Sequence, residues 1–208
     1  GWSVFSLPFD YTFINKKNNT FRGMVRSIDE VIYDNDGYVE IRFATVSSKI
    51  QANTPYILYT TETIENPEFD NVMLKAIADG SYSTTLSGEV SGTIDFVNTQ
   101  YRMPLAANGE THKEILFISS DNKLCYPAPN PGKSVTMRAF RGYFHMNADI
   151  KYAPVRLIGE DGEVLEMQQD AEGNLSPVNN ETRKYMENGV LYIERNGVRY
   201  TATGERVR

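Results

Sequence analysis

The chain has 208 residues, of which 40% are hydrophobic and 23% charged, so it is long enough and apolar enough to bury a core without disulfides. A formal net charge of −6 argues against a nucleic-acid-binding surface, and a single cysteine excludes an internal disulfide. No apolar run is long enough for a transmembrane helix, and the 13 Tyr and 10 Phe favour strands over helices.

The first third of the chain alternates between strand and turn patterns. Residues 2–9 (WSVFSLPF) predict a strand that ends at Pro8, which has no backbone N–H to donate. The segment 34–37 (DNDG) predicts a turn, and strands are expected at 38–46 (YVEIRFATV) and at 56–60 (YILYT).

The middle of the chain continues in the same way. Residues 72–78 are compatible with a strand or a short helix, and a strand is expected at 92–97. The segment 134–146 (SVTMRAFRGYFHM) is the longest strand candidate, and 155–158 predicts the last strand of the main body.

A hairpin is expected at 115–126, with Asp121 and Asn122 in its turn. A two-residue turn there places Ile118 opposite Cys125, and Phe117 opposite Tyr126. The prolines that follow it, Pro127, Pro129 and Pro131, predict an extended loop.

From Gly159 the composition becomes acidic. Residues 159–176 contain six Asp or Glu and no Lys or Arg, which predicts a solvated linker or extension over 159–189. A helix there would be short, around 181–186.

The last nineteen residues, 190–208, predict a β-hairpin. Asn196-Gly197 suits a type I′ turn, which needs positive φ at both central residues. This register pairs Arg195 with Val198, and successive pairs follow outward: Glu194 with Arg199, Ile193 with Tyr200, Tyr192 with Thr201, and Leu191 with Ala202. An isolated hairpin is only marginally stable, so it is expected to pack on another element.

Together these elements predict an all-β protein: an antiparallel β-sandwich or a distorted barrel, with a C-terminal β-hairpin extension. The expected organisation is a sandwich domain at 1–158, an acidic linker or extension at 159–189 and the hairpin at 190–208.

No catalytic or metal-binding constellation is legible. His112 and His145 are the only histidines, and each is interpreted as a surface or strand residue because a zinc site needs further ligands nearby. Cys125 is interpreted as a small buried hydrophobe. The segment 34–40 (DNDGYVE) faintly resembles a calcium loop, but a strand begins directly after Gly37, so turn chemistry explains it better. We expect no cofactor, no metal and no enzymatic activity.

The tyrosines have two readings. Most lie in or beside predicted strands and serve as core or cross-strand partners. If the protein binds sugars by stacking, the candidates are the exposed members of the set Trp2, Tyr101, Tyr126 and Tyr143. The sequence assigns no firm ligand-binding residue.

Several stretches resemble C-terminal β-rich modules of secreted and cell-surface proteins of Bacteroidetes, including leucine-rich-repeat surface proteins. The matching stretches are residues 2–9, 50–57 (IQANTPYI), 116–124 (LFISSDNKL), 138–144 (RAFRGYF) and 193–204 (IERNGVRYTATG). The resemblance implies a noncatalytic, exported and surface-associated module and transfers no catalytic residue.

The expected function is therefore a surface module for adhesion, glycan or protein binding, or spacing. It would be extracellular or at the cell surface, attached to a larger exported protein, with no signal peptide in this sequence. One alternative is a glycan-active hydrolase with an unrecognised carboxylate pair, and another is a purely structural anchoring or capping domain.

Overall fold

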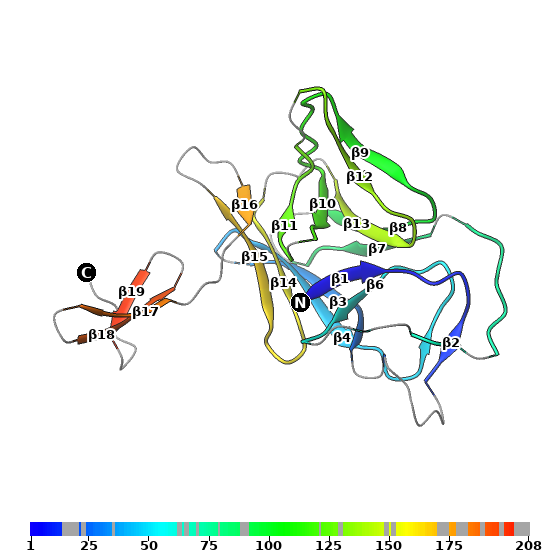
Figure 1. The fold of residues 1–208 in the computed structure, drawn as a ribbon, viewed down its shortest axis with the longest axis horizontal. Coiled ribbons are helices and arrows are strands. Elements are labelled where there is room, and N and C mark those ends of the chain that lie inside the picture. The colour runs from blue at the N-terminus through cyan, green and yellow to red at the C-terminus, as the bar shows by residue number, and fades with distance from the viewer. Residues whose placement is uncertain are drawn as a thin grey trace. The chain divides into compact units, whose positions relative to one another are not determined.

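The protein is built from β-strands joined by turns and loops (Figure 1). The computed structural model describes residues 1–13, 21, 24–34, 36–61, 64, 67–69, 71–78, 80–87, 92–120, 122–128, 131–147, 150, 153–169, 175–177, 183–187, 190–195 and 198–201. Across these residues no helix occurs, so the predicted all-β class is confirmed.

The larger sheet contains seven strands and combines the N-terminal quarter of the chain with a much later segment. In spatial order its strands are β1 (Trp2–Phe5), β6 (Tyr56–Tyr59), β3 (Val25–Tyr33), β4 (Val39–Thr45), β14 (Val155–Ile158), β15 (Val164–Gln169) and β16 (Leu175–Pro177). The neighbours β3 and β4 are antiparallel, whereas β14 pairs with β4 in parallel.

The second sheet contains five strands. In spatial order they are β11 (Leu124–Cys125), β10 (Ile115–Ile118), β13 (Arg141–Met146), β8 (Thr93–Thr99) and β7 (Ser81–Thr85). Two small two-stranded sheets accompany it, one of β9 (Met103–Ala107) with β12 (Ser134–Met137) and one of β2 (Tyr11–Thr12) with β5 (Lys49–Ile50).

The main core lies between the two larger sheets, as expected for a sandwich. Phe144 of β13 and Phe96 of β8 are almost wholly buried and stack with ring centroids 4.5 Å apart. Phe43 of the facing sheet meets Phe144 edge-on at 6.3 Å. The aromatic residues that suggested strands in the sequence therefore join the two layers.

A second apolar cluster is aromatic and includes the pair β2 and β5. Phe21 stacks on Phe5 and on Phe69, at 5.9 and 5.4 Å between ring centroids. Tyr11 meets Phe69 edge-on at 5.0 Å. The phenylalanines near the N-terminus thus build a core of their own beside β1.

Residues 177–208 form a separate compact unit from residues 1–176. Its three-stranded sheet consists of β17 (Arg183–Glu187), β18 (Val190–Arg195) and β19 (Val198–Thr201). The predicted hairpin register is confirmed for the four pairs from Arg195 with Val198 to Tyr192 with Thr201. The predicted turn at Asn196-Gly197 and the pair Leu191 with Ala202 include positions outside the described residues.

The acidic segment differs from the linker expected at 159–189. Strand β15 lies within it and pairs with β14 in the larger sheet, where Leu165 is buried. Leu165 is the buried apolar residue of β15, and its neighbour Val164 is half-buried. Gly162 lies in the tight turn that connects β14 to β15 and adopts φ +82°, which glycine tolerates. The short helix considered at 181–186 is also wrong, because β17 occupies Arg183–Glu187 and pairs with β18.

Two further expectations are corrected by positive φ angles. The long strand predicted at 134–146 is two strands, β12 and β13, because Phe140 adopts φ +57° between them. The hairpin of β10 and β11 pairs Phe117 with Cys125 rather than with Tyr126. In this turn the backbone N–H of Ser119 donates to the carbonyl of Lys123, and Asn122 adopts φ +56°. The connection between the paired residues is therefore one residue longer than the predicted two-residue turn, and this shifts the register.

Candidate functional site

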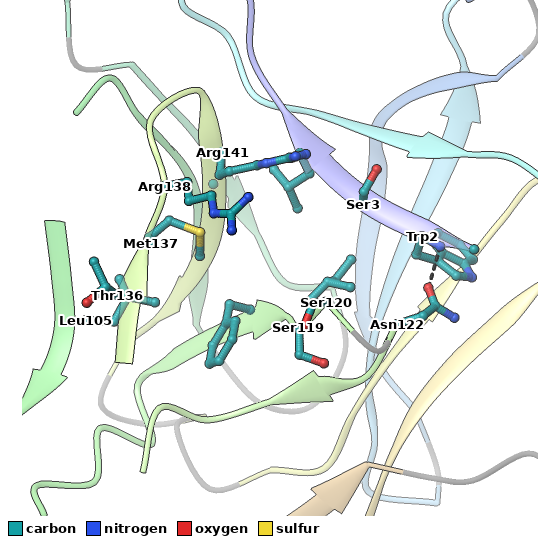
Figure 2. A pocket seen from close by; sticks show the side chains of 15 residues that line it. Trp2, Ser3, Leu105, Ser119, Ser120, Asn122, Thr136, Met137, Arg138 and Arg141 are labelled. Carbon is teal, nitrogen blue, oxygen red and sulfur yellow. Dashed lines mark hydrogen bonds between the residues drawn. The ribbon is translucent and has the colours of Figure 1, made fainter. Parts of the chain in front are cut away.

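An open groove of about 620 Å³ lies beside β1. Its lining comes from β1, from the turn between β10 and β11, and from the turn between β12 and β13 (Figure 2). These segments are far apart in the sequence, and the sandwich brings them together.

The turn between β10 and β11 forms one wall. Asn122, in its left-handed conformation, accepts a hydrogen bond from the backbone N–H of Trp2 through Oδ1. This bond ties the turn to β1 and leaves Ser119 and Ser120 in the lining of the groove. Ser120 is exposed.

The turn between β12 and β13 forms the opposite wall and is held by several hydrogen bonds. The N–H of Phe140 donates to the carbonyl of Thr99 at 2.6 Å, and the carbonyl of Phe140 accepts from Ser6 N–H at 3.2 Å. The Thr99 hydroxyl donates to the carbonyl of Arg138 at 2.8 Å and accepts from the N–H of Arg141 at 3.3 Å. Backbone contacts therefore fix the positions of Arg138, Phe140 and Arg141.

Gly142 permits this wall to approach its neighbours. A Cβ placed on Gly142 would lie 2.5 Å from the carbonyl oxygen of Val97 and 2.8 Å from Cγ1 of Val4. No side chain fits at those distances, so the glycine is required for the close packing of β13 against β8 and β1.

Arginines dominate the polar lining of this wall. Figure 2 shows Arg138 directed into the groove and Arg141 directed toward β1, where its Nη1 donates to the carbonyl of Val4 at 3.3 Å. A second hollow, of about 640 Å³, is lined by Arg102, Ser134 and Ala139 and shares Thr136 and Arg138 with the first. Arg138 thus stands where the two hollows meet.

None of Arg102, Arg138 and Arg141 forms an ion pair within the described part of the chain. Other arginines of residues 1–176 behave differently. The Arg42 guanidinium contacts Glu30 and Glu40 at 2.9 and 2.6 Å, and Arg156 pairs with Glu40 and Asp34. The groove therefore holds cationic groups that have no carboxylate partner among the described residues.

Two exposed aromatic residues are neighbours of these arginines in the sequence. Tyr101 is 67% exposed and Phe140 37% exposed, although both residue types are usually buried. Tyr101 precedes Arg102 in the turn between β8 and β9, and Phe140 lies between Arg138 and Arg141.

The structure separates the four aromatic candidates for sugar binding. Trp2 is buried in the main core, where its indole meets Phe43 and Tyr59 edge-on at 6.0 and 5.3 Å. Tyr126 is also buried, and its burial raises the pKa of the phenol above its usual value. Tyr143 is half-buried in β13, so Tyr101 is the exposed member of the set.

The histidines and the cysteine lie in ordinary surroundings outside the groove. His112 contacts Glu114 at 2.8 Å and Glu110 at 3.5 Å, and the hydrogen bond with Glu114 is the main cause that raises the His112 pKa. The Cys125 thiol contacts the carbonyls of Phe117 and Lys123. Among the residues described, no three His, Cys, Asp or Glu side chains are grouped as metal ligands.

The predicted turn at 34–37 is confirmed. The carboxylate of Asp34 accepts from the N–H groups of Asp36 and Tyr38, and Gly37 adopts φ +83°. The remaining contact of the carboxylate is with Arg156, so its oxygens are engaged within the fold.

The sequence patterns did not point to the groove arginines. One signal was present, because the stretch 138–144 (RAFRGYF) places two arginines around an aromatic residue. Their lack of carboxylate partners depends on contacts between distant segments and cannot be read from that stretch.

In the described ranges, no helix is long and apolar enough to cross a membrane. Comparison with known proteins gives no match to this chain, whether against family models, curated proteins or solved structures. The resemblance to surface modules of Bacteroidetes therefore stays a prediction.

Proposed function

We propose that this protein is a noncatalytic binding module of an exported, surface-associated protein, and that the groove beside β1 is its ligand site. The observation that carries the proposal is the groove itself: a hollow of about 620 Å³ lined by the hydroxyls of Ser119, Ser120 and Thr136, with the Arg138 side chain directed into it. Polar groups without partners in the fold are available to a ligand.

The composition of the lining favours binding over hydrolysis. A glycoside hydrolase needs two carboxyl groups about 5–10 Å apart across the scissile bond. The fifteen described residues that line the groove include no Asp, Glu, His or Cys. The described groups suit recognition through hydrogen bonds and charge, and none of them is a carboxylate or imidazole that could act as general acid or base.

A groove-filling variant tests the site without assuming the ligand. The purified protein is applied to an array of host and microbial glycans and to extracted surface proteins. We expect a reproducible ligand that is lost in Ser120→Trp, which fills the groove, and kept in Ser47→Trp, which places the same side chain at an exposed serine elsewhere. A ligand kept equally by both variants, or no ligand at all, would overturn the assignment.

The exported location has its own test. Fractionation of cells that carry the native gene should place the protein at the surface or in the medium. Recovery of the folded protein from the cytoplasm would contradict the surface role. It would not bear on the groove as a ligand site, which the binding assay tests separately.

A structural anchoring role is the second candidate, and the separate unit at 177–208 favours it. If this unit anchors the protein, removal of residues 178–208 should release the protein from the cell surface while ligand binding in the groove is kept. Unchanged surface retention after that deletion would eliminate the anchoring role.

A further inference from the structure

The two hollows form a local positive region on an acidic protein. Arg102, Arg138 and Arg141 line them, and the described residues of the two linings include no Asp or Glu. The chain as a whole carries a net charge of −6. Charge of this sign, concentrated at one site against the overall balance, favours an anionic ligand.

The arginines suit oxyanions in particular. A guanidinium presents a planar fork of N–H donors that matches carboxylate or sulfate in a bidentate way. Because no described residue provides a carboxylate partner for these three side chains, a ligand need not displace an ion pair formed within that part of the chain. Arg138, at the junction of the hollows, is placed to contact a ligand that extends through both.

The aromatic side chains could provide apolar contacts in addition to the charged ones. Phe140 and Tyr101 are partly exposed and adjoin the groove arginines in the sequence, although neither lines the hollows themselves, and exposed aromatic faces bury the apolar C–H surface of a sugar ring. Phe140 holds φ +57°, a conformation that disfavours any residue with a Cβ and that persists here through its hydrogen bonds. Backbone strain at an exposed aromatic residue points to a role in contacts outside the fold.

We propose that this site binds an acidic glycan, with the carboxylate or sulfate groups of the glycan on the arginines and its sugar rings against Phe140 and Tyr101. The hydroxyls of Ser119, Ser120 and Thr136 add hydrogen-bonding partners for sugar hydroxyls. A nucleic acid is the less favoured polyanion, because its dense charge is repelled by the acidic remainder of the chain. This inference rests on the proposed groove function and names its ligand class.

The test uses the complete chain and defined polymers. Affinity electrophoresis and calorimetry compare polygalacturonate, which carries carboxylates, with dextran sulfate, which carries sulfates, with neutral dextran and with a single-stranded oligodeoxynucleotide. We expect binding to at least one acidic polysaccharide, weakening as salt is raised, and no binding to dextran. Preference between the two acidic polymers identifies the anionic group.

Charge variants connect the binding to the site. Arg138→Gln should lower the affinity about tenfold, as expected for loss of one charge-assisted contact, and Arg102→Gln/Arg138→Gln should lower it further. Arg42→Gln is the matched control, because it removes the same charge from a partly exposed arginine outside both linings, and its affinity should stay within about twofold. Thermal melting verifies that each variant is folded.

The inference is overturned by failure to bind both acidic polymers, by equal binding of neutral dextran, by tighter binding of the oligodeoxynucleotide, or by an unchanged affinity in the double variant. These failures are distinct from failure of the proposed function. A neutral glycan or a protein that binds and is blocked by Ser120→Trp would keep the groove as a binding site while refuting the acidic-glycan assignment.

Discussion

The left-handed conformation of Phe140 leads us to expect that glycine at this position gives a more stable protein than alanine. Elsewhere, replacing alanine by glycine in folded structure destabilises a protein by about 0.5–1 kcal/mol, because glycine loses more freedom on folding. At φ +57° the order reverses, because a Cβ is strained there and glycine is not. Phe140→Gly should therefore be more stable than Phe140→Ala.

The size of the difference follows from the backbone contacts that hold this conformation. The N–H of Phe140 donates to Thr99 and its carbonyl accepts from Ser6, so the turn cannot relax to negative φ without losing both bonds. Alanine where φ is positive costs more than the usual 0.4–1 kcal/mol gain from stiffening the unfolded chain. We expect Phe140→Gly to exceed Phe140→Ala by about 1 kcal/mol, or about 2–4 °C in melting temperature.

Comparing the two variants with each other removes the contribution of the aromatic ring, which both lack. Urea unfolding at fixed pH and thermal melting give the two free energies of unfolding. If Phe140→Ala is as stable as Phe140→Gly, or more so, the residue does not carry strain and the argument from its backbone is wrong. Neither variant should bind the acidic polysaccharides as tightly as the native chain, because each lacks the ring.

Three further outcomes are expected. Gly142→Ala should destabilise by about 1–3 kcal/mol in urea unfolding, because the new methyl group meets the Val97 carbonyl at 2.5 Å; an unchanged midpoint would contradict that packing. Phe144→Ala should cost about 3–5 kcal/mol in the same assay, since the ring is wholly buried, and a loss under 1 kcal/mol would place it outside the core. The hydrogen bond with Glu114 raises the pKa of His112 in the folded protein, so the protonated His112 stabilises the fold at pH values below the ordinary histidine pKa of about 6.5. This stabilisation is lost as the pH rises through the pKa of His112 in the folded protein, and the melting temperature should fall over that pH interval. This fall in melting temperature should be absent in His112→Gln, and a fall that persists in that variant would show that another group causes it.

Local patterns predicted the elements whose structure depends on near neighbours. The turn at Asp34 and the register of the closing hairpin both follow from residues a few positions apart. The strand Val25–Tyr33 was not anticipated, because the register of its pairing with β4 shifts between Ile28 and Glu30 and interrupts the alternation of apolar and polar residues.

The residues of the candidate site could not be predicted from local sequence patterns, for a different physical reason. Its lining joins β1 to turns more than a hundred residues later, and only the packed sandwich decides which side chains face the hollow. Among the aromatic candidates, Trp2 was expected in the core of the first strand, with a sugar contact as the alternative, and the core position is confirmed. Its contacts with Phe43 and Tyr59 come from strands that the sequence alone does not place beside it.

The parallel pairing of β4 with β14 has a consequence for folding kinetics. Val155 pairs with Val39 although more than half of the chain separates them, and the whole five-stranded sheet is encoded between the two. Closing so large a loop before its contacts form is entropically costly, which predicts a high contact order and slow folding. Until β14 arrives, the edge of β4 is an open template for strands of other chains, so newly made protein is most prone to aggregate during that interval.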